Sequence, residues 1–151
     1  MRCVFGLLVI LCLTACSTRS TLEVDSFFMR DFSTPETDEP MVRMEKLRRL
    51  HGALTATERN DRLGHYYTMH WSDPSGAGKG EVELIFEYQQ GSTASKVKRQ
   101  WQRFASTDRN GKAEFRVTGN DYLKGGRVLA WNATLKRANR EVASHHSYLW
   151  E

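Results

Sequence analysis

The chain has 151 residues, of which 40% are hydrophobic and 26% are charged, a length that suffices for one domain but not for two domains with a linker. Its 22 lysine and arginine residues against 18 aspartate and glutamate residues give a formal net charge of +4. Because acidic and basic residues are interspersed, this balance excludes the one-sided charge typical of proteins that bind polyanions, so no nucleic-acid partner is expected.

The N-terminus is a short apolar run behind a single positive charge. Arg2 is followed by an almost unbroken apolar stretch from Cys3 to Leu13, which is about half of the roughly 20 residues needed to span a membrane. This length, together with the small residues that follow it, is typical of a secretory signal peptide rather than of a membrane-spanning helix.

The stretch Leu13-Thr14-Ala15-Cys16 resembles the lipobox of bacterial lipoproteins. The resemblance covers residues 1–16 and implies that residues 1–15 are a signal peptide that is cut off, and that Cys16 carries a diacylglyceryl group on its sulfur and usually an acyl chain on its amine. Several acyl chains on one residue hold a protein stably on a membrane. With Ser17 directly after the cysteine, the sequence resembles lipoproteins that are sorted to the outer membrane. An outer-membrane location in the bacterial envelope is therefore expected.

All three cysteines lie at or before the expected lipid attachment site, at Cys3, Cys12 and Cys16. The mature chain therefore has no free thiol, which excludes a disulfide framework, a cysteine nucleophile and a cysteine-based zinc site. No cofactor other than the covalent lipid on Cys16 is predicted, and the stability of the domain must come from a hydrophobic core.

Residues 16–40 are predicted to be a flexible tether, because they are rich in Ser, Thr, Asp, Glu and Pro. Their only apolar cluster is Phe27, Phe28, Met29 and Phe32, which is expected to dock on the domain or to stay disordered.

Residues 41–64 form the most ambiguous segment, which we expect to be a helical or irregular arm. Apolar residues recur at helical spacing, with charged residues between them, at Met41, Met44, Leu47, Leu50 and Leu54. This pattern favours a helix that ends near Gly52, followed by a turn of helix capped by Thr55 or Thr57. The alternative is a first β-strand over residues 48–54.

From His65 onward the hydrophobic period changes to two, which is typical of half-buried strands. The alternating segments are residues 65–71, 81–90, 96–104, 112–118, 127–136 and 140–150. Six or seven short strands predict a single antiparallel β-sandwich of the immunoglobulin-like kind over residues 65–151. The natural core anchors are the four tryptophans, Trp71, Trp101, Trp131 and Trp150.

Turn residues separate these segments. The glycine loop from Gly76 to Gly80 is predicted to close a hairpin, Asn110-Gly111 is a strong turn signal, and Ala138-Asn139 is a further turn. Residues 113–135 resemble the closing strands of immunoglobulin-like and fibronectin-like domains, with Tyr122 at the position expected for a tyrosine corner, although the likeness is one of architecture only.

No motif carries a reaction. The glycine loop lacks the spacing and the Ser or Thr of a phosphate-binding loop. His65 and His70 diverge on one strand, as do His145 and His146, so a shared metal site would need a cross-strand pair such as His70 with His145 or His146. Since no serine, base and orienting group are brought together by the sequence, we predict no catalytic residues and no metal ligands.

Two sets of residues are candidates for surface contacts. Tyr66, Thr68, His70 and Arg103 are expected to form one contact face. The basic run contains Lys96, Lys98, Arg99 and Arg103 and suits either an edge strand guarded against unwanted pairing or a grip on anionic envelope polymer. Three functions follow. The first is a non-catalytic module that binds or scaffolds another envelope component. The others are an envelope enzyme acting on cell-wall or lipid material with His70 or His146 as base, and a polymer-binding module.

Overall fold

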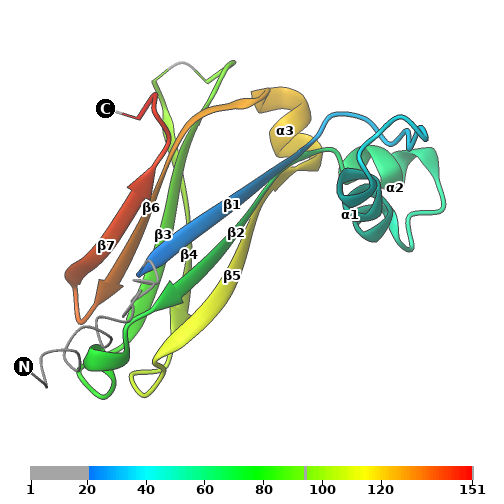
Figure 1. Cartoon of the computed structure of the whole chain (residues 1–151). Helices are drawn as coiled ribbons and strands as arrows, with labels where there is room; N and C mark the ends of the chain where they lie inside the picture. The colour runs from blue at the N-terminus through cyan, green and yellow to red at the C-terminus, as the bar shows by residue number, and fades with distance from the viewer. Residues whose placement is uncertain (1–20, 94, 151) are drawn as a thin grey trace, which may run out of the picture.

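A computed structural model describes residues 21–93 and 95–150, which form two antiparallel sheets packed face to face (Figure 1). The three-stranded sheet has the order β1-β2-β5 and the four-stranded sheet the order β4-β3-β6-β7. The prediction of a single β-sandwich is confirmed, with seven strands. The elements are β1 (Leu22–Met29), α1 (Pro40–Leu50), α2 (Ala56–Asp61), β2 (Gly64–Ser72), η1 (Pro74–Gly76), β3 (Val82–Gln90), β4 (Val97–Phe104), β5 (Asn110–Thr118), α3 (Gly119–Gly125), β6 (Val128–Arg137) and β7 (Arg140–His146).

The core lies between the sheets and follows the predicted alternation on β2, β3, β5 and β6. Its fully buried members come from both sheets and include Met69, Leu84, Phe86, Val117 and Leu135. Of the four predicted tryptophan anchors, Trp71 is buried at 2% exposure, and Trp131 and Trp150 are half-buried.

The prediction is wrong for Trp101, which is 60% exposed on the outer face of β4. Val97 and Trp101 on β4 point outward because the other face of the strand carries Lys98, which binds side chains of the sandwich. Lys98 donates to Gln90 Oε1 at 2.7 Å and pairs with Asp121, whose other oxygen accepts from Tyr88 at 2.6 Å. These bonds, together with Phe104, whose ring packs edge-on against Trp71 at 5.2 Å, hold this face of β4 inward.

Strand β1 corrects the prediction of a flexible tether over residues 16–40. It pairs with β2 along its whole length, from Leu22 opposite Trp71 to Met29 opposite Gly64. Leu22 and Met29 are buried, and Phe28 stacks on His65 with 4.0 Å between the ring centroids. The polar composition concealed the strand, because its outer face and edge lie toward solvent and need few apolar residues. Docking of the phenylalanine cluster is confirmed for Phe28.

Two of the predicted turns connect sheets rather than neighbouring strands. The glycine loop leads from β2 in one sheet to β3 in the other, so it closes no hairpin, and residues 105–109 carry the chain back from β4 to β5, with Asn110 and Gly111 inside β5. Arg137 ties both connections together by donating to Asp73 at 2.7 Å and to the carbonyl oxygens of Gly80 and Ser106, both at 3.0 Å. Such a charge-assisted network compensates the cost of burying the guanidinium.

The turn predicted at Ala138-Asn139 is confirmed, since both residues have positive φ, as a tight two-residue hairpin requires. In β7, which ends earlier than predicted, Ala143 packs against the core and the His145 ring meets Trp131 edge-on at 5.6 Å. Tyr122 lies in α3 and packs edge-on against Phe28 and His65, in place of the expected tyrosine corner.

Candidate functional site

The helical arm, residues 30–63, projects from the end of the sandwich where β1 stops and β2 starts (Figure 1). Helix α1 begins at Pro40, which suits the first turn because proline lacks an N–H donor. Helix α2 is capped by Thr55, whose hydroxyl accepts from Glu58 N at 3.2 Å while Glu58 accepts from Thr55 N at 2.9 Å. The helical prediction for residues 41–64 is confirmed, and the alternative strand over residues 48–54 is wrong.

Helix α1 is turned the opposite way from an ordinary amphipathic helix. Lys46 and Arg49 are only 8% and 6% exposed, whereas Met41, Met44 and Leu47 are 70%, 66% and 55% exposed. These three apolar residues follow one another at three-residue spacing and therefore lie along one side of the helix. We call Met41, Met44 and Leu47 the α1 stripe. Leu54, in the turn after the helix, is also exposed.

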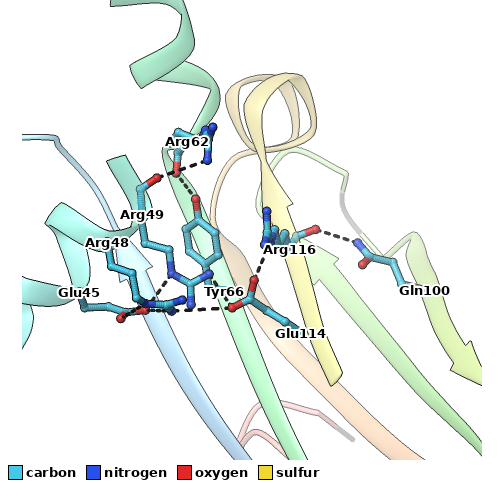
Figure 2. A network of polar contacts seen from close by, with 8 residues as sticks. All are labelled: Glu45, Arg48, Arg49, Arg62, Tyr66, Gln100, Glu114 and Arg116. Atoms are coloured by element: carbon cyan, nitrogen blue, oxygen red, sulfur yellow. Dashed lines mark hydrogen bonds and ion pairs between the residues drawn. The ribbon is translucent and has the colours of Figure 1, made fainter. Parts of the chain in front are cut away.

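Arg49 explains this orientation (Figure 2). Its guanidinium carbon lies 3.9 Å from the ring centroid of Tyr66 on β2, within the range of a cation–π contact. The same group forms ion pairs with Glu45 at 2.8 Å and with Glu114 on β5 at 2.6 Å. Burial alone would raise the pKa of Glu114, but Arg116 and Arg49 hold it below its ordinary value. One buried cation thus fastens the helix to two strands.

The same network joins the two helices of the arm, and it reaches the neighbouring sheet where Gln100 on β4 donates to the Arg116 carbonyl at 2.9 Å (Figure 2). Tyr66 donates its hydroxyl hydrogen to the Arg62 carbonyl at 2.5 Å, and Arg62 reaches the Arg49 carbonyl at 3.4 Å. Glu45 also pairs with Arg48, and the two arginines lower the pKa of Glu45 to about 2, Arg48 having the larger effect. These contacts hold α1 in one orientation on α2 and β2.

Lys46 fixes the loop that enters the helix. Its ammonium group donates to Asp31 at 3.2 Å, to Asp38 at 3.0 Å and to the Ser33 carbonyl at 2.9 Å. Burial alone would lower the pKa of Lys46, but the hydrogen bonds to Asp38 and Asp31 raise it overall. Since Lys46 and Arg49 occupy the inward side of α1, the α1 stripe is left facing outward.

The prediction from the sequence missed the anchoring roles of Lys46 and Arg49. Charged residues between apolar ones at helical spacing normally form the solvated side of a helix, so the apolar residues appeared to be the buried ones. A signal was present in Glu45, which stands four residues before Arg49 and can orient it. However, the partners Tyr66 and Glu114 are distant in sequence, and only the fold brings them beneath α1.

The predicted contact face divides between two surfaces. Tyr66, Thr68 and His70 share the outer face of β2, where Tyr66 is buried under the arm and Thr68 and His70 are half-buried. Arg103 lies on β4 in the other sheet. The residues therefore do not form one patch, because β2 and β4 belong to opposite layers of the sandwich.

The predicted basic run is largely neutralised by neighbouring carboxylates. Besides the Lys98 pair with Asp121, Arg99 pairs with Glu87 at 2.5 Å and Arg103 with Glu83 at 3.3 Å, while Lys96 is exposed before β4 begins. Strand β4 lies at a sheet edge, so these charges fit the interpretation of an edge guarded against pairing with other chains.

The histidines do not converge. His70 is on β2 and His145 and His146 are on β7, in different sheets, so the proposed cross-strand pair is not formed. Over residues 21–93 and 95–150, no cluster of three or more His, Cys, Asp or Glu side chains is placed to hold a metal ion. His70 does line a surface hollow together with Glu23, but within that part of the chain no hydrogen bond joins the two side chains.

Cys16 lies outside the described residues, and so does the signal peptide. Within the described ranges, no helix has the length and apolar character needed to cross a membrane. Comparison of the chain with known protein families, with curated proteins and with solved structures finds no match. The geometry of the arm is therefore the main guide to function.

Proposed function

We propose that this chain is a lipid-anchored protein of the bacterial cell envelope, held on the outer membrane through Cys16, and that it binds another envelope protein through the α1 stripe without catalysing a reaction. The lipobox-like residues Leu13 to Cys16 support the anchor. The exposed α1 stripe carries the proposal of a partner.

The α1 stripe leaves apolar surface exposed to water, which is unfavourable for an isolated domain. Contiguous exposed apolar side chains mark interaction surfaces more often than scattered ones do, and methionine is well suited to such surfaces because its flexible side chain adapts to its partner. Here Met41, Met44 and Leu47 are exposed while two cations are buried beneath the same helix. The sandwich stabilises a helix orientation that a partner can use.

The position of the arm favours a protein over the anchoring membrane as the occupant. The arm lies at the end of β1 opposite to its start, and an eight-residue strand is about 26 Å long. The lipid on Cys16 lies before the start of β1. The helix and its N-cap carry exposed charges of both signs, Glu39 and Arg48, whereas helices that lie on membranes are bordered mainly by Lys and Arg.

A photo-crosslinking amino acid at position 47 tests the proposal in intact cells. The matched control is position 129 on β6, because Leu47 and Leu129 are both 55% exposed. We expect one protein adduct of defined mass from position 47 and none from position 129. The same adducts from both positions, or adducts with lipid alone, would contradict a specific protein site on α1.

The anchor has its own test. We expect Cys16→Ser, made behind a signal sequence that is cleaved without lipid, to move the protein from the membrane fraction into a high-salt wash, because one residue carries all the acyl chains and salt weakens charge contacts with headgroups. A Cys16→Ser protein that stayed with the membrane after a high-salt wash would show that the lipid anchor is wrong.

A further inference from the structure

A hollow of about 320 Å³ lies on the outer face of the three-stranded sheet, at the end where β1 begins. Five polar side chains line it: Glu23, His70, Ser72, Asn110 and Lys112. Gly111 and the buried Trp71 also line it, and a Cβ on Gly111 would point to the opposite side of the sheet, toward the Trp71 ring. The arm covers the other end of this sheet, so the hollow is a separate site.

The charged groups of the hollow stand in one row across three strands. Glu23 on β1 is opposite His70 on β2, and His70 is opposite Lys112 on β5. The side chains of such a row project from the same face of the sheet. The row therefore presents an acid, an imidazole and an ammonium group side by side.

These groups are uncommitted, unlike the other charges of the same face. Glu114 and Arg116 on β5 pair with each other at 2.7 Å, and Glu114 also pairs with Arg49. Across the described ranges 21–93 and 95–150, Glu23, His70 and Lys112 make no side-chain hydrogen bond or ion pair. Polar groups of both signs around a hollow, without internal partners, are the arrangement that a ligand of both signs would satisfy.

We infer that this hollow binds a phosphoethanolamine group, with the ligand's phosphate at Lys112 and its ammonium at Glu23. Two strand spacings place the backbones of Glu23 and Lys112 about 9.5 Å apart, and two charge-assisted hydrogen bonds of about 2.8 Å each leave roughly 4 Å between the ligand's charged atoms. A two-carbon spacer covers such a span. His70 lies between them and can bond the phosphate.

The source of this group is a phospholipid of the anchoring membrane, an assignment that rests on the proposed lipid at Cys16. Glu23 follows Cys16 by seven positions in the chain, so even a fully extended linker places it within about 25 Å of the lipid attachment point. The hollow is thus within reach of the headgroup layer, whereas the arm begins one strand length further away. Binding a headgroup there would orient the sandwich with the α1 stripe outward.

The mature chain from residue 16 onward, carrying Cys16→Ser, is the protein to use, because without the apolar residues 3–13 and without acyl chains its vesicle binding reports the hollow alone. NMR titration with soluble phosphoethanolamine should shift the amide signals of residues 70, 72 and 110–112. Phosphocholine, whose methylated nitrogen has no N–H donor for Glu23, should bind roughly tenfold or more weakly. Vesicles of phosphatidylcholine with phosphatidylethanolamine should retain the protein, and vesicles of phosphatidylcholine alone should not.

Glu23→Gln and Lys112→Gln should each weaken binding roughly ten- to hundredfold. The matched control is Asp25→Asn, which removes an exposed carboxylate on the same face of β1 outside the hollow. Equal binding of phosphocholine, or no shift at these residues, would overturn the site. Binding of the soluble compound without vesicle binding would overturn the membrane source. Either result is distinct from a failure of crosslinking at position 47 or of release by Cys16→Ser.

Discussion

Replacing Arg49 with alanine should loosen the arm from the sandwich. The substitution removes a cation–π contact worth up to about 2 kcal/mol and ion pairs to Glu45 and Glu114. Breaking a buried ion pair typically costs about 3–5 kcal/mol because an unpaired charge is left behind. Here Glu45 keeps Arg48 and Glu114 keeps Arg116, so we expect the lower end, a loss of about 3 kcal/mol in the free energy of unfolding.

Arg48→Ala is the control, because Arg48 is the adjacent residue, pairs with the same Glu45 at 2.6 Å and reaches Glu114 only at 4.0 Å. The Arg48 side chain is 61% exposed against 6% for Arg49, and exposed pairs contribute about 0–1 kcal/mol. Urea unfolding gives both free energies, and hydrogen exchange of the α1 amides shows whether the loss is local to the arm. Exchange should accelerate in Arg49→Ala and stay near the wild-type rate in Arg48→Ala.

Equal losses in the two variants would refute the reasoning, since they would mean that burial against Tyr66 and Glu114 contributes nothing beyond the helix-surface pair. Unchanged exchange in α1 after Arg49→Ala would refute it as well, because the arm would then be held by other contacts.

Two further predictions concern the sandwich. Burial and the nearby Arg127 lower the pKa of His65 to about 4. The unfolded chain therefore takes up this proton at about pH 6.5, but the folded chain does so only near pH 4. The free energy of unfolding should be full above pH 6.5 and fall by up to about 3 kcal/mol as the pH drops to 4. Urea titrations at both ends should show that loss diminished in His65→Gln, and an identical loss would contradict it. Gly111→Ala should cost about 2 kcal/mol in urea unfolding, since the new methyl carbon would lie 2.6 Å from Trp71 Nε1. Gly91→Ala, whose nearest contact is 3.9 Å away, should stay within about 0.5 kcal/mol, and an equal cost for both would argue against the clash.

Strand periodicity predicted most of the sandwich, because strands buried on one face must alternate wherever their core side chains meet the other sheet. The exceptions have local causes. In β4 the inward face carries Lys98, whose partner Asp121 is far away in sequence, so the visible alternation of Val97 and Trp101 indicated the wrong face. In β1 only a few inward positions needed apolar residues, and the strand was concealed by its polar neighbours.

The candidate sites were harder to predict, since they depend on which strands become neighbours. Glycine and Asn-Gly signals mark a change of direction but do not distinguish a hairpin from a crossing between sheets. Glu23 lies opposite His70 only because β1 pairs with β2, and the sequence did not reveal β1. The Arg49 site forms only because the fold brings Tyr66 and Glu114 together beneath α1. His70 was identified as a candidate, although the partners suggested for it lie in the other sheet.

The arm is an insertion into a hairpin. Met29 and Gly64 face each other at the last rung of the β1–β2 ladder, so the arm's residues form one long loop between two directly paired strands. Closing a loop of about 34 residues rather than one of about four costs roughly 2 kcal/mol more in chain entropy. The pairing of β1 with β2 is therefore as non-local as that of β2 with β5, which are separated by residues 73–109. Equally, the arm could be lengthened, shortened or exchanged without shifting the register of any strand, which leaves the surface it presents free to change while the sandwich beneath it stays the same.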